Sequence, residues 1–129
     1  MMGSSDLMLS TMHRARVKFE SETLRVTHRH VNGLARILVE AYGFSTELTG
    51  TQSRVFSHLL DHLGSWVSHE QLRLAATTGA DIYDSSLIRV HMHKIRRRLA
   101  SFPLAIVTTR GLGTRLVFDE SQVLMQILS

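Results

Sequence analysis

A run of basic side chains within residues 86–99 (SLIRVHMHKIRRRL) could bind an anionic partner. Lys94, Arg96, Arg97 and Arg98 lie close together, and residues 87–100 contain no Asp or Glu. Guanidinium groups match the geometry of phosphate oxygens and guanine edges. A charged helix face is often only solvated, but such a face usually mixes charges of both signs. The missing acids therefore favour a nucleic-acid-binding surface.

The same segment predicts a helix with one buried side. At about 100° per residue, four apolar residues form a narrow stripe that would face the core: Ile88, Met92, Ile95 and Leu99. Four residues lie roughly opposite: Val90, His93, Lys94 and Arg97. Arg89 and Arg96 flank one side, and His91 and Arg98 flank the other. A DNA major groove is wide enough for such a helix, and Val90 could contact a thymine methyl group.

A second candidate contact lies near the end of the chain. Residues 105–109 (AIVTT) and 114–118 (TRLVF) have the composition of two strands, and the glycine-containing segment 110–113 (RGLG) between them predicts a β-hairpin. The glycines would allow the backbone to approach a ligand closely. Arg110 could enter a minor groove or bind a phosphate there, although taken alone it could equally be an ordinary exposed arginine.

The upstream elements that would support these contacts begin with predicted strands. Residues 17–27 alternate apolar and polar side chains and are interpreted as one strand. Asn32-Gly33 is a two-residue hairpin signal. Residues 34–42 fit a strand or a short helix, and the flanking strands favour a strand. Residues 44–48 are predicted to form another short strand.

Two helices are predicted before the basic segment. Thr49 with Gln52, and Ser68 with Gln71, have the spacing of capping boxes, in which the first side chain caps the helix and the second reaches back. Apolar residues at helical spacing follow Thr49, and Gly64 is predicted to be the C-cap.

Ser85 or Ser86 is expected to cap the third, basic helix. Residues 77–84 are interpreted as a loop, and residues 119–129 as a short amphipathic helix. The predicted order is therefore strands, three helices and a hairpin.

The composition fits one domain in a reducing compartment. The 129 residues include 15 Lys and Arg against 11 Asp and Glu, and arginine outnumbers lysine 13 to 2. Cysteine is absent, which excludes disulfides and thiolate metal sites and makes the cytoplasm the expected location. No apolar run approaches the ~18 residues of a membrane span, so no membrane partner is expected.

Enzymatic and metal-binding functions have little support in the sequence. It contains no nucleophile elbow, P-loop or dinucleotide fingerprint, so no enzyme activity and no cofactor are expected. Three histidine pairs have close spacing: His28 and His30, His58 and His62, and His91 and His93. His58 and His62 have the i,i+4 spacing that can chelate zinc. No carboxylate or cysteine completes a ligand set, so solvated histidines are the preferred interpretation and no metal is expected.

Residues 48–118 resemble the winged-helix DNA-binding domain of the OmpR/PhoB type, usually the C-terminal effector of two-component response regulators. The resemblance is carried, in order, by Leu48-Thr49 before an amphipathic helix, residues 64–72 (GSWVSHEQL), 88–99 (IRVHMHKIRRRL) and 107–116 (VTTRGLGTRL). It implies an α+β fold, a winged helix-turn-helix with an N-terminal antiparallel sheet, a three-helix core and a C-terminal β-hairpin wing. The expected division is an N-terminal extension at 1–16, the winged-helix domain at 17–118 and a tail at 119–129.

The resemblance also implies DNA contacts. His91, His93, Lys94 and Arg96 take contact positions on the recognition helix, Val90 lies near a base, and Thr108 and Arg110 meet phosphates or the minor groove. With the helix pattern above, the predicted DNA-binding set is Arg89, Val90, His91, His93, Lys94, Arg96, Arg97, Thr108 and Arg110. Two positions depart from the family pattern: Ser86 replaces a common arginine, and Thr114 stands where an aromatic is frequent.

The expected function is that of a bacterial, cytoplasmic transcription regulator that binds double-stranded DNA sequence-specifically as a homodimer. No receiver domain is recognised, so the chain is expected to be a stand-alone regulator or a fragment. Residues 77–84 match the loop that contacts RNA polymerase in some members, but its usual tryptophan is missing. The alternative is a winged-helix module that binds protein, because the fold does not fix the function.

Overall fold

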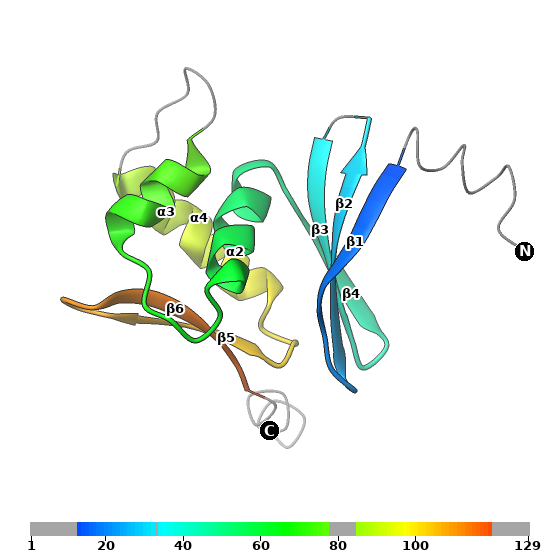
Figure 1. Cartoon of the computed structure of the whole chain (residues 1–129). Helices are drawn as coiled ribbons and strands as arrows, with labels where there is room; N and C mark the ends of the chain where they lie inside the picture. Colours follow the sequence, from blue (N-terminus) through cyan, green and yellow to red (C-terminus); the bar gives the residue numbers. More distant parts are fainter. Residues whose placement is uncertain (1–12, 33, 78–84, 120–129) are drawn as a thin grey trace, which may run out of the picture.

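The computed structural model describes residues 13–32, 34–77 and 85–119 (Figure 1). A four-stranded sheet is followed by three helices and a two-stranded hairpin. This order confirms the predicted α+β winged helix. The expected loop at 77–84, apart from Thr77, and the expected C-terminal helix, apart from Asp119, lie outside the described residues.

The N-terminal sheet is an antiparallel meander of β1 (His13–Glu20), β2 (Leu24–Val31), β3 (Leu34–Ala41) and β4 (Phe44–Thr49). Val31 pairs with Leu34 across the predicted hairpin turn, and Ala41 pairs with Phe44. Tyr42 and Gly43 between the latter two have φ of 53° and 79°, as two-residue hairpin loops require. The predicted strands at 34–42 and 44–48 are confirmed.

The single strand predicted at 17–27 is wrong, because the chain turns between β1 and β2. The Ser21 hydroxyl accepts hydrogen bonds from the backbone N–H groups of Thr23 (3.3 Å) and Leu24 (3.1 Å). A serine side chain can bond its own backbone in this way and stabilise a tight turn. The alternation of apolar and polar residues continues on both sides of the turn, so periodicity alone did not reveal it.

The first two helices are α2 (Gly50–Asp61) and α3 (His69–Ala76). The Ser68 hydroxyl accepts from the Gln71 N–H (3.1 Å), and the Gln71 side chain accepts from the Ser68 N–H (2.9 Å), which confirms the second capping box. The first one is wrong: Thr49 precedes α2 but makes no side-chain cap. Thr49 is still paired with Arg36 as the last residue of β4, so its conformation is set by the sheet.

Two predicted helix boundaries also differ from the structure. The helix α2 ends at Asp61 with His62 as its C-cap, so Gly64 is not the cap. Gly64 has φ of 83° and its N–H donates to the Leu116 carbonyl oxygen (2.8 Å). The basic helix α4 spans Ser85–Arg98, which places both Ser85 and Ser86 inside the helix, so neither is its cap.

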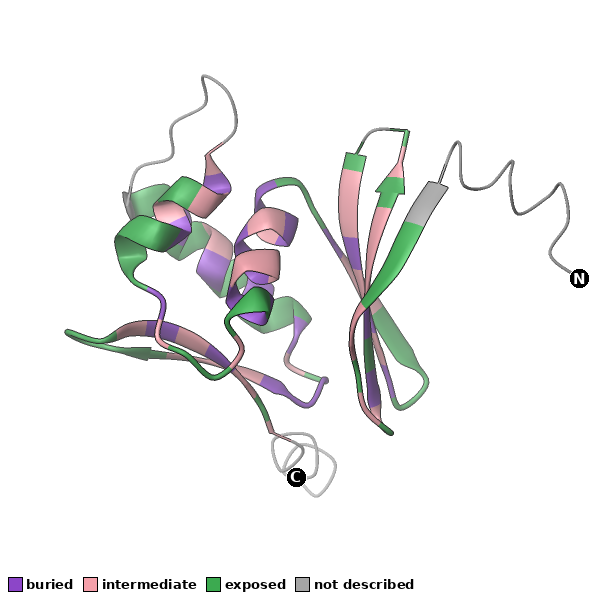
Figure 2. Ribbon diagram, viewed as in Figure 1, coloured by how far each residue is buried: buried purple, intermediate pink, exposed green. Residues whose placement is uncertain are grey.

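One hydrophobic core joins the sheet, the helices and the hairpin (Figure 2). Its largest fully buried side chains include Leu24 and Ile37 from the sheet, Phe56 from α2, Leu72 from α3 and Ile95 from α4. Burial of such side chains is the main force that holds the elements together. Among the described residues, no helix is long and apolar enough to cross a membrane.

The hairpin consists of β5 (Leu104–Thr109) and β6 (Gly113–Phe118), and we call these strands with residues 110–112 the wing. In Figure 1 it runs beneath the helices. Val67, in the link between α2 and α3, exchanges two backbone hydrogen bonds with Thr114 of β6 (2.7 and 2.9 Å). The Phe19 ring of β1 contacts the Phe118 ring of β6 at 5.6 Å between centroids. The wing is therefore attached to both the helices and the sheet.

Candidate nucleic-acid interface

The helix α4 is anchored by one apolar face. Ile88 and Ile95 are fully buried, and Met92 and Leu99 are at most 5% exposed. This confirms the four-residue stripe predicted from the sequence. Because the stripe fixes the rotation of the helix, the remaining faces must point away from the core.

Most of the predicted contact residues lie on those outward faces. Val90 is 47% exposed. The exposed residues of the predicted set are Arg89, Val90, His93, Lys94, Arg96, Arg97, Thr108 and Arg110. His91 is half-buried at the edge of the helix. The structure thus places the predicted helix residues on the outward faces of α4, with Thr108 and Arg110 on the wing.

The positive charge of α4 is not neutralised by acids within the described residues. The five ion pairs found there are Lys18–Asp61, Arg25–Glu20, Arg29–Glu47, Arg36–Glu47 and Arg73–Glu70. None of them involves a residue of α4 or of the wing. The exposed Arg89, Lys94, Arg97 and Arg98 of α4 are therefore available for an external anion.

A basic hollow of about 500 Å³ lies between α2 and α4, lined by Gln52, Lys94, Arg97 and Arg98. Its charge suits a phosphate group. Gln52 was missed as a candidate by the sequence analysis, which gave it a capping role. Its position beside the arginines depends on how α2 packs against α4, and no local pattern reports that packing.

The environment of His91 keeps its imidazole neutral more readily than usual. Burial lowers its pKa, and the positive charges of Lys94 and Arg54 lower it further. Arg54 is held close by donating to the carbonyl oxygen of Ala76 at the end of α3 (3.0 and 3.2 Å). At neutral pH a neutral His91 can both donate and accept a hydrogen bond.

The wing tip is shaped by glycines. Gly111 and Gly113 have φ of 85° and 111°, conformations that favour glycine. A Cβ atom at Gly113 would stand 2.3 Å from the Val67 carbonyl oxygen. The close approach of β6 to Val67 therefore requires glycine at this position, and it holds Arg110 and the 54% exposed Leu112 at the tip.

Arg96 and Thr108, both predicted DNA contacts, form a side-chain hydrogen bond with each other. The Arg96 Nη2 donates to the Thr108 Oγ1 (2.6 Å), and its Nε donates to the Ile106 carbonyl oxygen (3.3 Å). The Thr108 hydroxyl is 3.1 Å from that of Thr114. A side-chain connection therefore runs from α4 into both strands of the wing.

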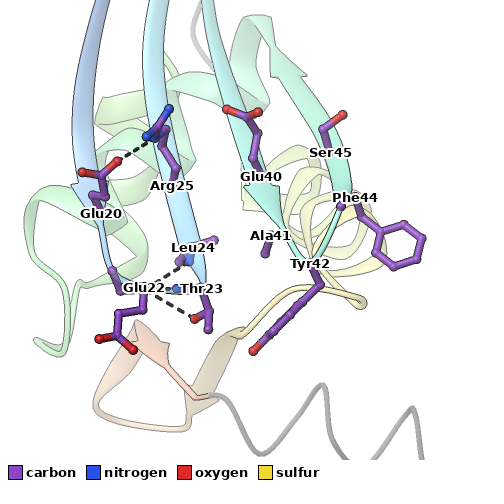
Figure 3. A pocket seen from close by; sticks show the side chains of 12 residues that line it. Glu20, Glu22, Thr23, Leu24, Arg25, Glu40, Ala41, Tyr42, Phe44 and Ser45 are labelled. Carbon is purple, nitrogen blue, oxygen red and sulfur yellow. Dashed lines mark hydrogen bonds and ion pairs between the residues drawn. The ribbon is translucent and has the colours of Figure 1, made fainter.

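A different hollow, of about 380 Å³, lies where the β1–β2 and β3–β4 turns meet (Figure 3). Its lining includes Glu20, Glu22 and Glu40 beside the exposed rings of Tyr42 and Phe44. Carboxylates repel phosphates, so this end of the sheet is unsuited to nucleic acid. The basic and acidic surfaces are thus on separate elements.

The histidine pairs do not assemble a metal centre in the described part of the chain. The His58 and His62 rings lie 4.5 Å apart, and the His62 Nδ1–H donates to the His58 carbonyl oxygen (2.8 Å). His28 and His30 also pair, at 4.6 Å. No third His, Asp or Glu joins either pair to form a group able to hold a metal ion, among the residues described.

Comparison with known proteins agrees with this geometry. The family described as "Transcriptional regulatory protein, C terminal" matches residues 43–116. A solved structure, the C-terminal domain of the nisin resistance regulator NsrR, a lantibiotic response regulator, matches with a TM-score of 0.52 and 26% identity over 61% of this chain and 82% of that one. Curated proteins gave no match. The chain belongs to the OmpR/PhoB-type family of DNA-binding transcription regulator domains.

Proposed function

We propose that this regulator binds double-stranded DNA sequence-specifically, with α4 in the major groove and the wing tip at Arg110 on the minor groove or backbone. Family membership supports DNA as the partner. The observation that carries the groove assignment is α4 itself. Its apolar stripe is buried, and its outward cations have no acidic partner among the described residues.

Different residues of α4 serve different parts of this contact. Lys94 and Arg97, beside the basic hollow, are suited to neutralise phosphates and so set the position of the helix. Arg89 and His93 carry donors that can reach base edges. The exposed Val90 offers an apolar contact for a thymine methyl group.

The wing supplies the second contact. Arg110 is exposed at a tip whose backbone is held in a narrow turn by glycines. An arginine at such a tip fits the negative potential of a narrow minor groove. Contact at two separate places on the duplex would define the orientation of the protein on its site.

The test is selection of bound duplexes from a random-sequence pool, followed by titration of a selected duplex across a range of salt concentrations. We expect enrichment of a common sequence and binding that weakens steeply with salt, by a logarithmic slope of about 0.9 for each phosphate contact. Absence of binding to any duplex at low salt would contradict the proposal. It would favour the alternative, a winged-helix module that binds protein.

We further propose that the regulator acts as a homodimer on two half-sites about one helical turn apart. Gel-shift titration with one and with two half-sites tests this, because a dimer binds the paired sites cooperatively. Contact with RNA polymerase through residues 77–84 is a separate proposal. A polymerase pull-down with and without alanine substitutions within residues 77–84 tests it.

A further inference from the structure

We infer that Arg96 is a positioning residue, which locks the wing to α4 and fixes the angle at which the two meet DNA. The effect of Arg96 on DNA binding rests on the proposed function, whereas its hydrogen bonds to the wing are present in the protein without DNA. The inference starts from one side chain with two partners on a different element.

The guanidinium of Arg96 donates hydrogen bonds to two residues of β5. Its Nε donates to the Ile106 carbonyl oxygen (3.3 Å), and its Nη2 donates to the Thr108 hydroxyl (2.6 Å). The two donors belong to one rigid planar group, so bonding both acceptors fixes the direction of the strand relative to the helix. A lysine would keep the charge but has no fork with which to hold both acceptors.

The connection continues across the wing. Thr108 and Thr114 are cross-strand partners, and their hydroxyl oxygens are 3.1 Å apart. Thr114 is 7% exposed, and its backbone exchanges two hydrogen bonds with Val67. The wing is therefore held on β6 by backbone bonds to the α2–α3 link and on β5 by the Arg96 side chain.

This arrangement also accounts for Thr114, which departs from the aromatic frequent at this position in the family. A threonine supplies a hydroxyl that meets Thr108, and Thr108 in turn bonds Arg96. An aromatic side chain has no such short hydroxyl at the strand surface. We therefore assign Thr114 to the same positioning set as Arg96 and Thr108.

The competing role for Arg96 is direct phosphate binding. A phosphate that bonded Nε and Nη2 would have to replace both hydrogen bonds to β5. Arg96→Lys separates the two roles only in the free protein, where it breaks the link to β5, because a bidentate phosphate contact needs the guanidinium fork as well. On DNA the two roles are separated by Thr108→Val, which removes only the hydroxyl and leaves the Arg96 fork free for a phosphate.

The link is tested first in the free protein. Amide hydrogen exchange is measured for the wing, including the Leu112 N–H that donates to the Thr109 carbonyl oxygen. We expect Arg96→Lys and Thr108→Val each to speed exchange in the wing by roughly tenfold while α2 and α3 keep their protection. Arg25→Lys, a charge-conserving change on the sheet, is the control. Unchanged exchange in the wing would overturn the link.

The DNA consequence is tested with a duplex selected from a random pool. We expect Arg96→Lys and Thr108→Val each to weaken binding by on the order of tenfold, and the double variant to bind no worse than either. Adding Arg110→Ala to Arg96→Lys should cost less than Arg110→Ala alone, because the wing is already displaced.

Two results would overturn the positioning role: wild-type affinity for Arg96→Lys, or losses that multiply in the double variant. If the unaltered chain bound no duplex, the proposed function and the DNA consequence would both fail. The exchange measurement would still decide whether Arg96 holds the wing.

Discussion

At the scale of residues, the proposed DNA binding depends on which cations have no acidic partner in the protein and can therefore bind a phosphate. Lys94 and Arg97 line the basic hollow and have no ion-pair partner among the described residues. Arg25, in contrast, is paired with Glu20 at 2.6 Å on the far sheet. The unpaired Lys94 and Arg97 are therefore expected to contribute more to phosphate binding than the paired Arg25. Substitution of each residue can measure this difference.

Lys94→Ala, Arg97→Ala and Arg110→Ala should each weaken DNA binding without unfolding the protein, because all three side chains are exposed. Each phosphate contact removed should lower the salt slope by about 0.9. Fluorescence anisotropy across salt measures both quantities, with Arg25→Ala as the matched control on the sheet. Wild-type binding by all three variants would contradict the groove assignment.

At the scale of elements, the caps and turns decide where helices begin and how the wing sits. Ser68 satisfies the capping pattern in full, whereas Thr49 has the same spacing to a glutamine but makes no cap. The difference lies in what precedes each residue: Thr49 is still bound into β4. The two sites therefore form a natural comparison.

Ser68→Ala should destabilise the fold by about 1 kcal/mol, because the Gln71 N–H loses its acceptor. Thr49→Ala should change stability by less than about 0.5 kcal/mol, since no side-chain cap is lost. Urea unfolding followed by circular dichroism measures both. Equal losses in the two variants would show that the cap at Ser68 contributes nothing of its own.

Gly113→Ala should destabilise the protein by more than about 1 kcal/mol. The new Cβ would meet the Val67 carbonyl oxygen at 2.3 Å, and φ of 111° disfavours any side chain. Gly111→Ala is the comparison, because a Cβ there meets nothing within 4 Å, although its φ of 85° is still strained. A smaller loss at Gly113 than at Gly111 in thermal melting would argue against the close approach.

The sequence predicted elements whose signals are local. The stripe of α4 repeats along one helix, and Ser68 with Gln71 lies within one turn, so both could be recognised from spacing. The turn at Ser21 interrupted a pattern that looked continuous, and only pairing between strands separates β1 from β2. The bond between Arg96 and Thr108 joins residues 12 positions apart on two elements. Such a contact depends on packing that no local pattern encodes.

At the scale of the whole molecule, contacts between elements keep the sheet, helices and wing in one arrangement. The Lys18 ammonium group of β1 forms an ion pair with Asp61 (2.6 Å) and donates a hydrogen bond to the Ser57 hydroxyl (3.0 Å), both on α2. The Phe19 ring contacts the Phe118 ring of the wing. The half-buried His28 and His58 line a hollow together with Ser57 and Asp61. Their protonation therefore bears on the stability of the entire fold.

Stability should fall as the pH drops below about 6.5. Burial is the main cause that lowers the pKa of His28, His58 and His91 in the folded protein. His30, Lys18 and Arg16 add to the effect at His28, and His62 adds to it at His58. The unfolded chain consequently binds protons at a higher pH than the folded chain, so stability is present above the ordinary pKa and is lost as protons bind.

Urea unfolding at neutral and at mildly acidic pH measures this dependence. The double variant His28→Gln with His58→Gln removes two of the titrating groups and should show a shallower loss between the two conditions. If the wild-type protein were equally stable at the two pH values, or more stable at the acidic one, this would contradict the lowered pKa values of the three histidines in the folded protein.

The central claim is that α4 occupies the major groove, and methylation protection on a selected duplex tests it most directly. Dimethyl sulfate modifies guanine N7 in the major groove and adenine N3 in the minor groove, so one experiment reports on both grooves. We predict protected guanine N7 atoms within each half-site, with protection at some of these guanines reduced in Arg89→Ala. A bound site in which every guanine N7 stays reactive would contradict the account.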